Sequence, residues 1–123
     1  DLKKIVKNMK NLKLYFNLPS LIHLMQNTDL LVSGGGSINL QRMILGIPGI
    51  IIAIAQNQFE TSNALMNSGY VNFLGSDAEV NQEIIYKAVK KILLNSSKNL
   101  EQSNRMKQLI DLDFMDKINQ HFC

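Results

Sequence analysis

The fold is decided by the stretch Asp29-Leu30-Leu31-Val32-Ser33-Gly34-Gly35-Gly36-Ser37, an apolar run that ends in three glycines and a serine. The apolar run predicts a buried strand over residues 30–33, and the serine is placed to cap a helix over residues 37–45. Glycines let a backbone turn tightly and let a ligand approach, and a helix N-terminus offers free N–H groups to an anion such as phosphate. A strand-to-helix turn without a ligand is the alternative for this segment.

Apolar and amphipathic segments alternate on both sides of this turn. Residues 49–54 are apolar and rich in isoleucine without polar alternation, which is typical of a strand covered on both faces of a parallel sheet. The pattern predicts further strands at 12–16 and 70–73, a turn at 75–77, and a loop at 95–97. It predicts helices at 2–9, 18–27, 58–67, 80–94 and 98–120, the last with a break near 111–113. Such alternation with short loops predicts an α/β domain with a Rossmann-like parallel sheet and flanking helices.

The composition is that of one globular domain spanning residues 1–123, with 46% apolar and 19% charged residues. The net charge of +3 comes from dispersed lysines, and no basic block is interleaved with aromatic residues, which argues against a nucleic-acid partner. The single cysteine, Cys123, forms no internal disulfide, so a reducing, cytoplasmic location is expected. No transmembrane segment, metal-ligand pair or resident cofactor is expected from the sequence.

The glycine turn matches neither common phosphate-binding motif. A dinucleotide-binding fingerprint needs a third glycine where Asn39 stands, and a Walker A loop needs Gly-Lys-Ser/Thr. A second loop, Ala55-Gln56-Asn57-Gln58, follows the next strand. Because ligands of parallel sheets bind beyond the carboxyl ends of the strands, the two loops are expected to share one binding rim. Arrangements typical of catalysis are missing, and His23 is expected on a helix surface.

Together with Gln41-Arg42, Leu45-Gly46-Ile47-Pro48 and Asn63-Ala64-Leu65, these loops resemble the C-terminal domain of B-type glycosyltransferase-fold proteins. The pattern is most similar to the UDP-sugar hydrolase of pseudaminic-acid biosynthesis and to related spore-coat polysaccharide proteins. The resemblance covers residues 12–73. It implies the C-terminal half of a two-domain fold that lacks its first strands, with the N-terminal domain of the same polypeptide missing from this sequence.

The resemblance also implies roles for individual residues. The residues implied to contact the phosphates and the nucleotide are Gly34, Gly35, Gly36, Ser37, Gln41 and Gln58. Gln41 stands where these proteins usually have a ribose-binding glutamate. Asn57 matches an active-site asparagine of the hydrolase. The segment of Phe16 and Asn17 matches the loop whose backbone contacts the base.

The implied function is binding of a UDP-sugar in polysaccharide or nonulosonic-acid biosynthesis. A hydrolase-like reaction is preferred, in which activated water attacks the anomeric carbon and UDP leaves. The hydrolase's catalytic histidine belongs to the missing domain, so this chain alone is expected to be inactive. One alternative is a glycosyltransferase domain, in which an acceptor hydroxyl replaces water. Another is a degenerate, non-catalytic binding module, which Gln41 and Ile38 favour because they replace more polar residues.

Overall fold

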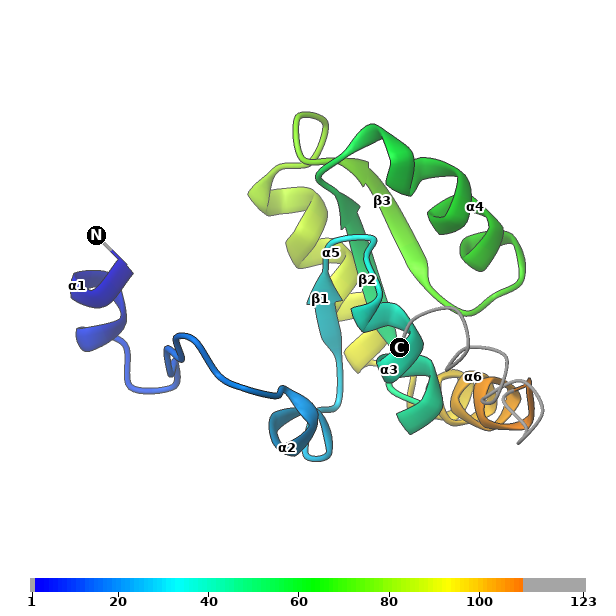
Figure 1. Ribbon diagram of the computed structural model, residues 1–123, viewed down its shortest axis with the longest axis horizontal. Coiled ribbons are helices and arrows are strands. Elements are labelled where there is room, and N and C mark those ends of the chain that lie inside the picture. Colours follow the sequence, from blue (N-terminus) through cyan, green and yellow to red (C-terminus); the bar gives the residue numbers. More distant parts are fainter. Residues whose placement is uncertain (1, 110–123) are drawn as a thin grey trace.

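The computed structural model describes residues 2–109, and its centre is a three-stranded parallel sheet (Figure 1). The strands are β1 (Leu31–Ser33), β2 (Gly49–Ala53) and β3 (Asn72–Ser76), in the order β1-β2-β3. Both strand pairs are parallel, and Ile50 lies opposite Val32 on one side and Asn72 on the other. This arrangement confirms the predicted α/β fold with a Rossmann-like parallel sheet.

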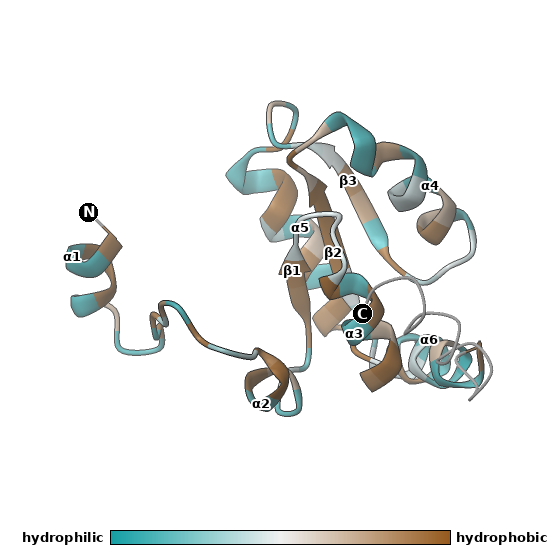
Figure 2. Cartoon of the chain, viewed as in Figure 1, coloured by the Kyte–Doolittle hydropathy of each residue, from teal (hydrophilic) through white to brown (hydrophobic). Residues whose placement is uncertain are grey.

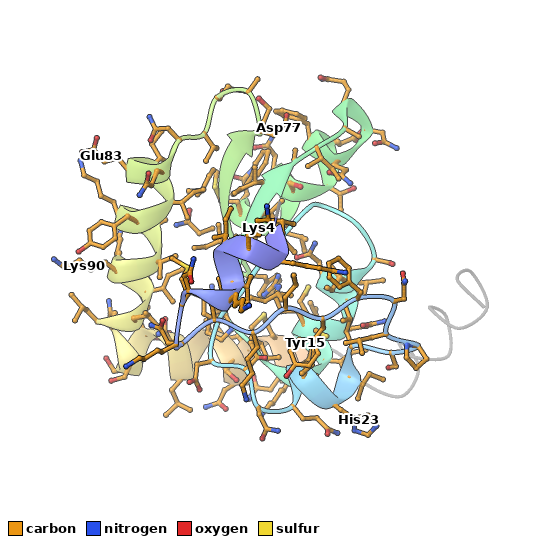
Figure 3. All side chains as sticks on the ribbon, turned by 90° about the vertical axis from the view of Figure 1, so that its left-hand side faces the viewer. Lys4, Tyr15, His23, Asp77, Glu83 and Lys90 are labelled. Atoms are coloured by element: carbon orange, nitrogen blue, oxygen red, sulfur yellow. The ribbon has the colours of Figure 1, made fainter. Side chains whose placement is uncertain are left out.

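Helices cover both faces of the sheet. In Figures 1 and 3, α3 (Ile38–Leu45) and α4 (Phe59–Asn67) lie on one face and α5 (Gln82–Leu93) lies on the other. The last described helix, α6 (Ser96–Leu109), packs against α3 and α5. A short 3-10 helix, η1 (Gln56–Gln58), leads into α4. Two short helices, α1 (Leu2–Lys7) and α2 (Ile22–Met25), precede the sheet.

The core is built around β2. Ile50, Ile51 and Ala53 are buried there, and Figure 2 shows this strand as an almost continuous hydrophobic band. The other buried apolar residues come from the surrounding elements: Met25, Met43, Ile47, Val71, Ala88 and Met106. Strands flank β2 on both edges, and helices cover both faces of the sheet. The sequence of β2 therefore needs no polar alternation, as predicted.

Three glycines have the left-handed backbone that side chains disfavour: Gly46 (φ 71°), Gly69 (φ 81°) and Gly75 (φ 111°). Gly46 follows the last residue of α3, which confirms its predicted role in ending that helix. Gly75 lies inside β3, where the register against β2 shifts between Ile51 and Ile52. The segment predicted as a turn at 75–77 is therefore in part a bulged strand, since Gly75 and Ser76 still pair with β2.

Gly46→Ala is expected to destabilise the protein by about 1–2 kcal/mol, because the left-handed conformation strains any residue with a Cβ. A Cβ would also collide with Ser103 Oγ and with the Lys107 side chain of α6. Urea unfolding measures this effect. Gly34→Ala is the matched control, because its Cβ would make only ordinary contacts of 3.6 Å with Ile54, and its φ is not in the left-handed region. Equal stability of the two variants would contradict the prediction.

The segment 12–16 is not a strand, contrary to the prediction. It has no regular secondary structure and no ladder partner among the described residues, and β1 is the edge strand of the described sheet. Figure 1 shows the chain before α2 as an arm that leaves the sheet at the amino end of β1. An alternating sequence can specify extended backbone, but a strand also needs a neighbour with which to exchange hydrogen bonds.

Three other boundaries differ from the prediction. The helix expected at 18–27 is only α2, because residues 18–21 remain outside it and Ser20 Oγ accepts the Ile22 N–H. The strand expected at 70–73 begins two residues later, and α6 already includes Ser96 and Ser97 of the expected loop. The break expected near 111–113 lies outside the described residues. Within residues 2–109, no helix is long and apolar enough to cross a membrane.

Candidate ligand-binding rim

The glycine turn (residues 34–37) and the η1 loop (residues 54–58) meet at the carboxyl ends of β1 and β2. A single side-chain oxygen connects them, because Gln58 Oε1 accepts the backbone N–H groups of Gly35 (3.2 Å) and Ile54 (3.0 Å). The structure therefore brings together the two loops that the sequence predicted to share a rim. The amino group of Gln58 has no hydrogen-bond acceptor within the described residues, so it remains available as a donor.

The three glycines of the turn differ in what the fold requires of them. A Cβ on Gly35 would lie 2.8 Å from Gln58 Cβ and 3.0 Å from Ser62 Oγ, so this position is closed by the packing of the turn against α4. A Cβ on Gly34 would make only ordinary contacts. A Cβ on Gly36 would meet nothing within 4 Å. None of the three has a positive φ, so neither packing nor backbone conformation demands glycine at 36.

Free hydrogen-bond donors collect at the outer end of the turn. The backbone N–H groups of Gly36 and Ser37 have no acceptor within residues 2–109, and both residues are exposed. Further into α3, the backbone N–H groups of Asn39 and Leu40 are not free, because they donate to Gly36 O and Ser37 O. The Ser37 side chain does not cap α3, contrary to the prediction, so its hydroxyl is also available.

Asn39 organises the inner side of the turn. It stands where a dinucleotide-binding fingerprint would have its third glycine, and no role was predicted for it. Its Nδ2 donates to Gly34 O (3.0 Å) and Gly36 O (3.1 Å), and its Oδ1 accepts from Arg42 Nε (3.2 Å). Asn39 is 3% exposed. A polar residue in the first turn of a helix is the sequence signal for such an anchor, but the same signal is common on solvated helix faces.

Arg42 is fully buried behind Asn39, between α3, the start of β2 and α6. Its Nη1 donates to Ile47 O (2.9 Å) and lies 3.5 Å from Met106 Sδ, while Nη2 has no hydrogen-bond partner. No carboxylate among the described residues forms an ion pair with it. Burial lowers the pKa of Arg42 to about 10, so the guanidinium still carries its charge at neutral pH. A positive charge without an ion-pair partner in the described residues therefore lies behind Asn39, beside Gly49 and Met106.

The remaining candidate residues lie at different distances from the turn. Gln41 is exposed on α3, and Asn57 is exposed on η1, next to Gln58. Phe16 and Asn17 belong to the arm before α2. Figure 1 shows that this arm joins the sheet at the amino end of β1, whereas the glycine turn follows the carboxyl end. The base-contacting role of Phe16 and Asn17 stays a prediction.

The only histidine that the structure describes is far from the rim. Figure 3 shows His23 of α2 at the opposite end of the molecule from Asp77, which follows β3 at the rim. Its exposed position on α2 agrees with the surface position predicted for it. Among residues 2–109, no three His, Cys, Asp or Glu side chains are grouped so that they could hold a metal ion.

Comparison with known proteins gives the fold. No model of a protein family matches the sequence, and no curated protein matches it. The crystal structure of a protein described as the glycotransferase of kitacinnamycin is similar, with a TM-score of 0.68 and 17% sequence identity over 80% of this chain. The chain spans only 25% of that structure's length. The protein therefore has the fold of part of a glycosyltransferase, an α/β unit with a parallel sheet flanked by helices.

Proposed function

We propose that this chain is the nucleotide-sugar-binding domain of a two-domain, glycosyltransferase-like enzyme, and that the glycine turn binds the diphosphate. The observation that carries this proposal is Gly36. The fold has room for a side chain there and a backbone that accepts one, yet the position is a glycine facing solvent. A ligand that approaches the backbone closely accounts for the absence of a side chain.

The groups around Gly36 suit a diphosphate. The N–H groups of Gly36 and Ser37, the Ser37 hydroxyl and the Gln58 amino group are all donors without protein acceptors in the described residues. The N-terminus of α3 adds the positive end of its dipole, and Arg42 adds a buried positive charge. Such donors, fixed before the ligand arrives, stabilise negative charge that develops on a leaving diphosphate.

The finer assignments rest on the resemblance of the two loops. We propose a UDP-sugar as ligand, with Gln41 at the ribose and Asn57 at the sugar. The preferred reaction is hydrolase-like, so water attacks the anomeric carbon, the bond to the diphosphate oxygen breaks, and UDP leaves. In a transferase, an acceptor hydroxyl would attack at the same place. We propose that an N-terminal domain of the same polypeptide holds the water or the acceptor in either case.

A titration of the ¹⁵N-labelled chain with UDP, monitored by amide NMR shifts and compared with CMP, tests the proposal. We expect shifts centred on residues 34–37, 41 and 57–58, with tighter binding of UDP. No shifts in a well-dispersed spectrum would overturn nucleotide binding by this chain and support a non-catalytic module. Shifts confined to other parts of the chain would overturn the assignment of this rim.

Gln58→Glu separates the two functions of that side chain. A carboxylate keeps an oxygen for the Gly35 and Ile54 N–H groups, so the two loops should stay connected and the fold intact. It replaces the free amino group with a second acceptor, which repels a diphosphate. We expect UDP affinity to fall by about tenfold or more, equivalent to about 1.4 kcal/mol. Isothermal titration measures this loss, with Gln108→Glu on exposed α6 as the control of equal charge. Equal affinity of the two variants would contradict a ligand contact at Gln58.

A further inference from the structure

We infer that Asn39 and Arg42 form a buried positioning pair for the diphosphate: Asn39 holds the carbonyl groups of the glycine turn inward, and Arg42 fixes the Asn39 amide. This inference rests on the proposed function, because it assigns how the same turn becomes complementary to an anion. Neither residue touches the ligand. Both act through the backbone of residues 34–36.

The backbone dipoles of the glycine turn have a direction that Asn39 helps to set. Gly34 O and Gly36 O both accept from the single Nδ2 group of Asn39, which is buried under the turn. A carbonyl that pointed outward would place partial negative charge against the diphosphate. With both carbonyls bound from inside, an anion at the outer end of the turn meets the free N–H groups of Gly36 and Ser37 instead.

Arg42 sets the orientation of the Asn39 amide. An asparagine amide can be rotated by half a turn, which exchanges its donor and acceptor ends. Arg42 permits only one orientation, because its Nε–H needs the oxygen of Asn39 and would oppose the amino group. Gly49 makes this placement possible, since a Cβ there would collide with Arg42 Nε, Cδ and Cζ.

The guanidinium of Arg42 also contributes its positive charge. Arg42 has no ion-pair partner among residues 2–109, and its Nη2 group is unpartnered. The charge therefore polarises Asn39 without being neutralised locally, and it favours an anion at the turn. Arg42 also contacts Ile47 O and Met106 Sδ, so the pair is anchored to the loop before β2 and to α6.

Asn39→Asp is the decisive variant. Aspartate keeps the acceptor for Arg42 and gains an ion pair with it, so the variant should fold. It loses the Nδ2 donor to Gly34 O and Gly36 O and places carboxylate oxygen against both carbonyls, which still accept from Ser33 Oγ and from the backbone N–H of residue 39. We therefore expect the turn to shift. We expect the Kd for UDP to rise at least about tenfold, together with changed amide shifts of residues 34–37 in the ligand-free protein. Asn104→Asp, an exposed α6 position with the same change in charge, should bind UDP as the wild-type chain does.

Asn39→Ser provides a second test if the aspartate variant does not fold. Its single hydroxyl can replace only one donor, and we expect a loss of about fivefold, equivalent to one ordinary hydrogen bond. Every Kd is measured where urea unfolding shows the variant to be fully folded, so lost stability alone does not alter it. Unchanged Kd values in both variants would overturn the positioning role of Asn39 and Arg42 and would leave the proposed function standing. A wild-type chain that binds neither UDP nor pyrophosphate would overturn the proposed function and this inference with it.

Discussion

Gly36→Leu should abolish UDP binding and leave the free energy of unfolding within about 1 kcal/mol of the wild-type value. The added side chain has space in the fold, because a Cβ there meets nothing within 4 Å and the φ is not in the left-handed region. It would occupy the place where a phosphate must lie to reach the N–H groups of Gly36 and Ser37. We expect a loss of at least about a hundredfold in affinity, equivalent to about 2.7 kcal/mol.

Two further variants make this result specific. Ala64→Leu adds a similar side chain at an exposed position of α4 and should bind UDP like the wild-type chain. Gly35→Leu should also lose UDP binding, but because the fold is destabilised. Its Cβ would lie only 2.8 Å from Gln58 Cβ, so urea unfolding should show a large loss of stability. Unchanged UDP affinity of a folded Gly36→Leu protein would refute diphosphate binding at the glycine turn.

Arg42→Ala should be the most destabilising of the substitutions considered, by about 3–5 kcal/mol. It removes a large buried side chain and leaves Ile47 O and Asn39 Oδ1 without their donors. Part of this loss is offset, because the buried charge itself is unfavourable. The lowered pKa of Arg42 shows the direction of that effect: burial favours the neutral form in the folded state, so the charged form opposes folding at neutral pH.

Arg42→Met separates the contribution of the Arg42 side-chain volume to stability from that of its charge. Methionine fills most of the space and removes the desolvated charge, although the two acceptors still lose their donors. We therefore expect a destabilisation of about 1–2 kcal/mol, well below that of alanine. Urea unfolding of the two variants and the wild-type chain measures the difference. Equal losses for alanine and methionine would mean that the hydrogen bonds of Arg42, and not its volume, decide its contribution.

The fold was largely predictable because its strongest signals are local. The apolar run of β2 and the glycine that ends α3 place their elements correctly, since burial on both faces and a left-handed C-terminal residue are properties of short segments. The absence of a strand at residues 12–16 was not predictable in the same way. The pattern of this segment specifies a conformation, while its membership of a sheet depends on a neighbouring strand elsewhere in the chain.

The candidate site was predictable only in its outline. Both loops were recognised from sequence, but the distinct requirements at Gly34, Gly35 and Gly36 follow from what lies opposite each one in space. The contribution of Asn39 could not be predicted, because its bonds depend on a buried arginine one turn later in the same helix. A sequence shows that Arg42 is charged but does not show that it is buried without a counter-ion.

The shared oxygen of Gln58 has a genetic consequence. Since one atom accepts hydrogen bonds from both loops, a substitution that removes it damages two segments of the rim at once. The effect of this substitution on binding should be strongly non-additive with that of a second substitution in either loop. The reason is that loss of the Gln58 oxygen already removes a hydrogen bond from each loop. In a library of double mutants, position 58 should therefore couple epistatically to the glycine turn and to the η1 loop. Pairs of substitutions that leave Gln58 intact should combine nearly independently.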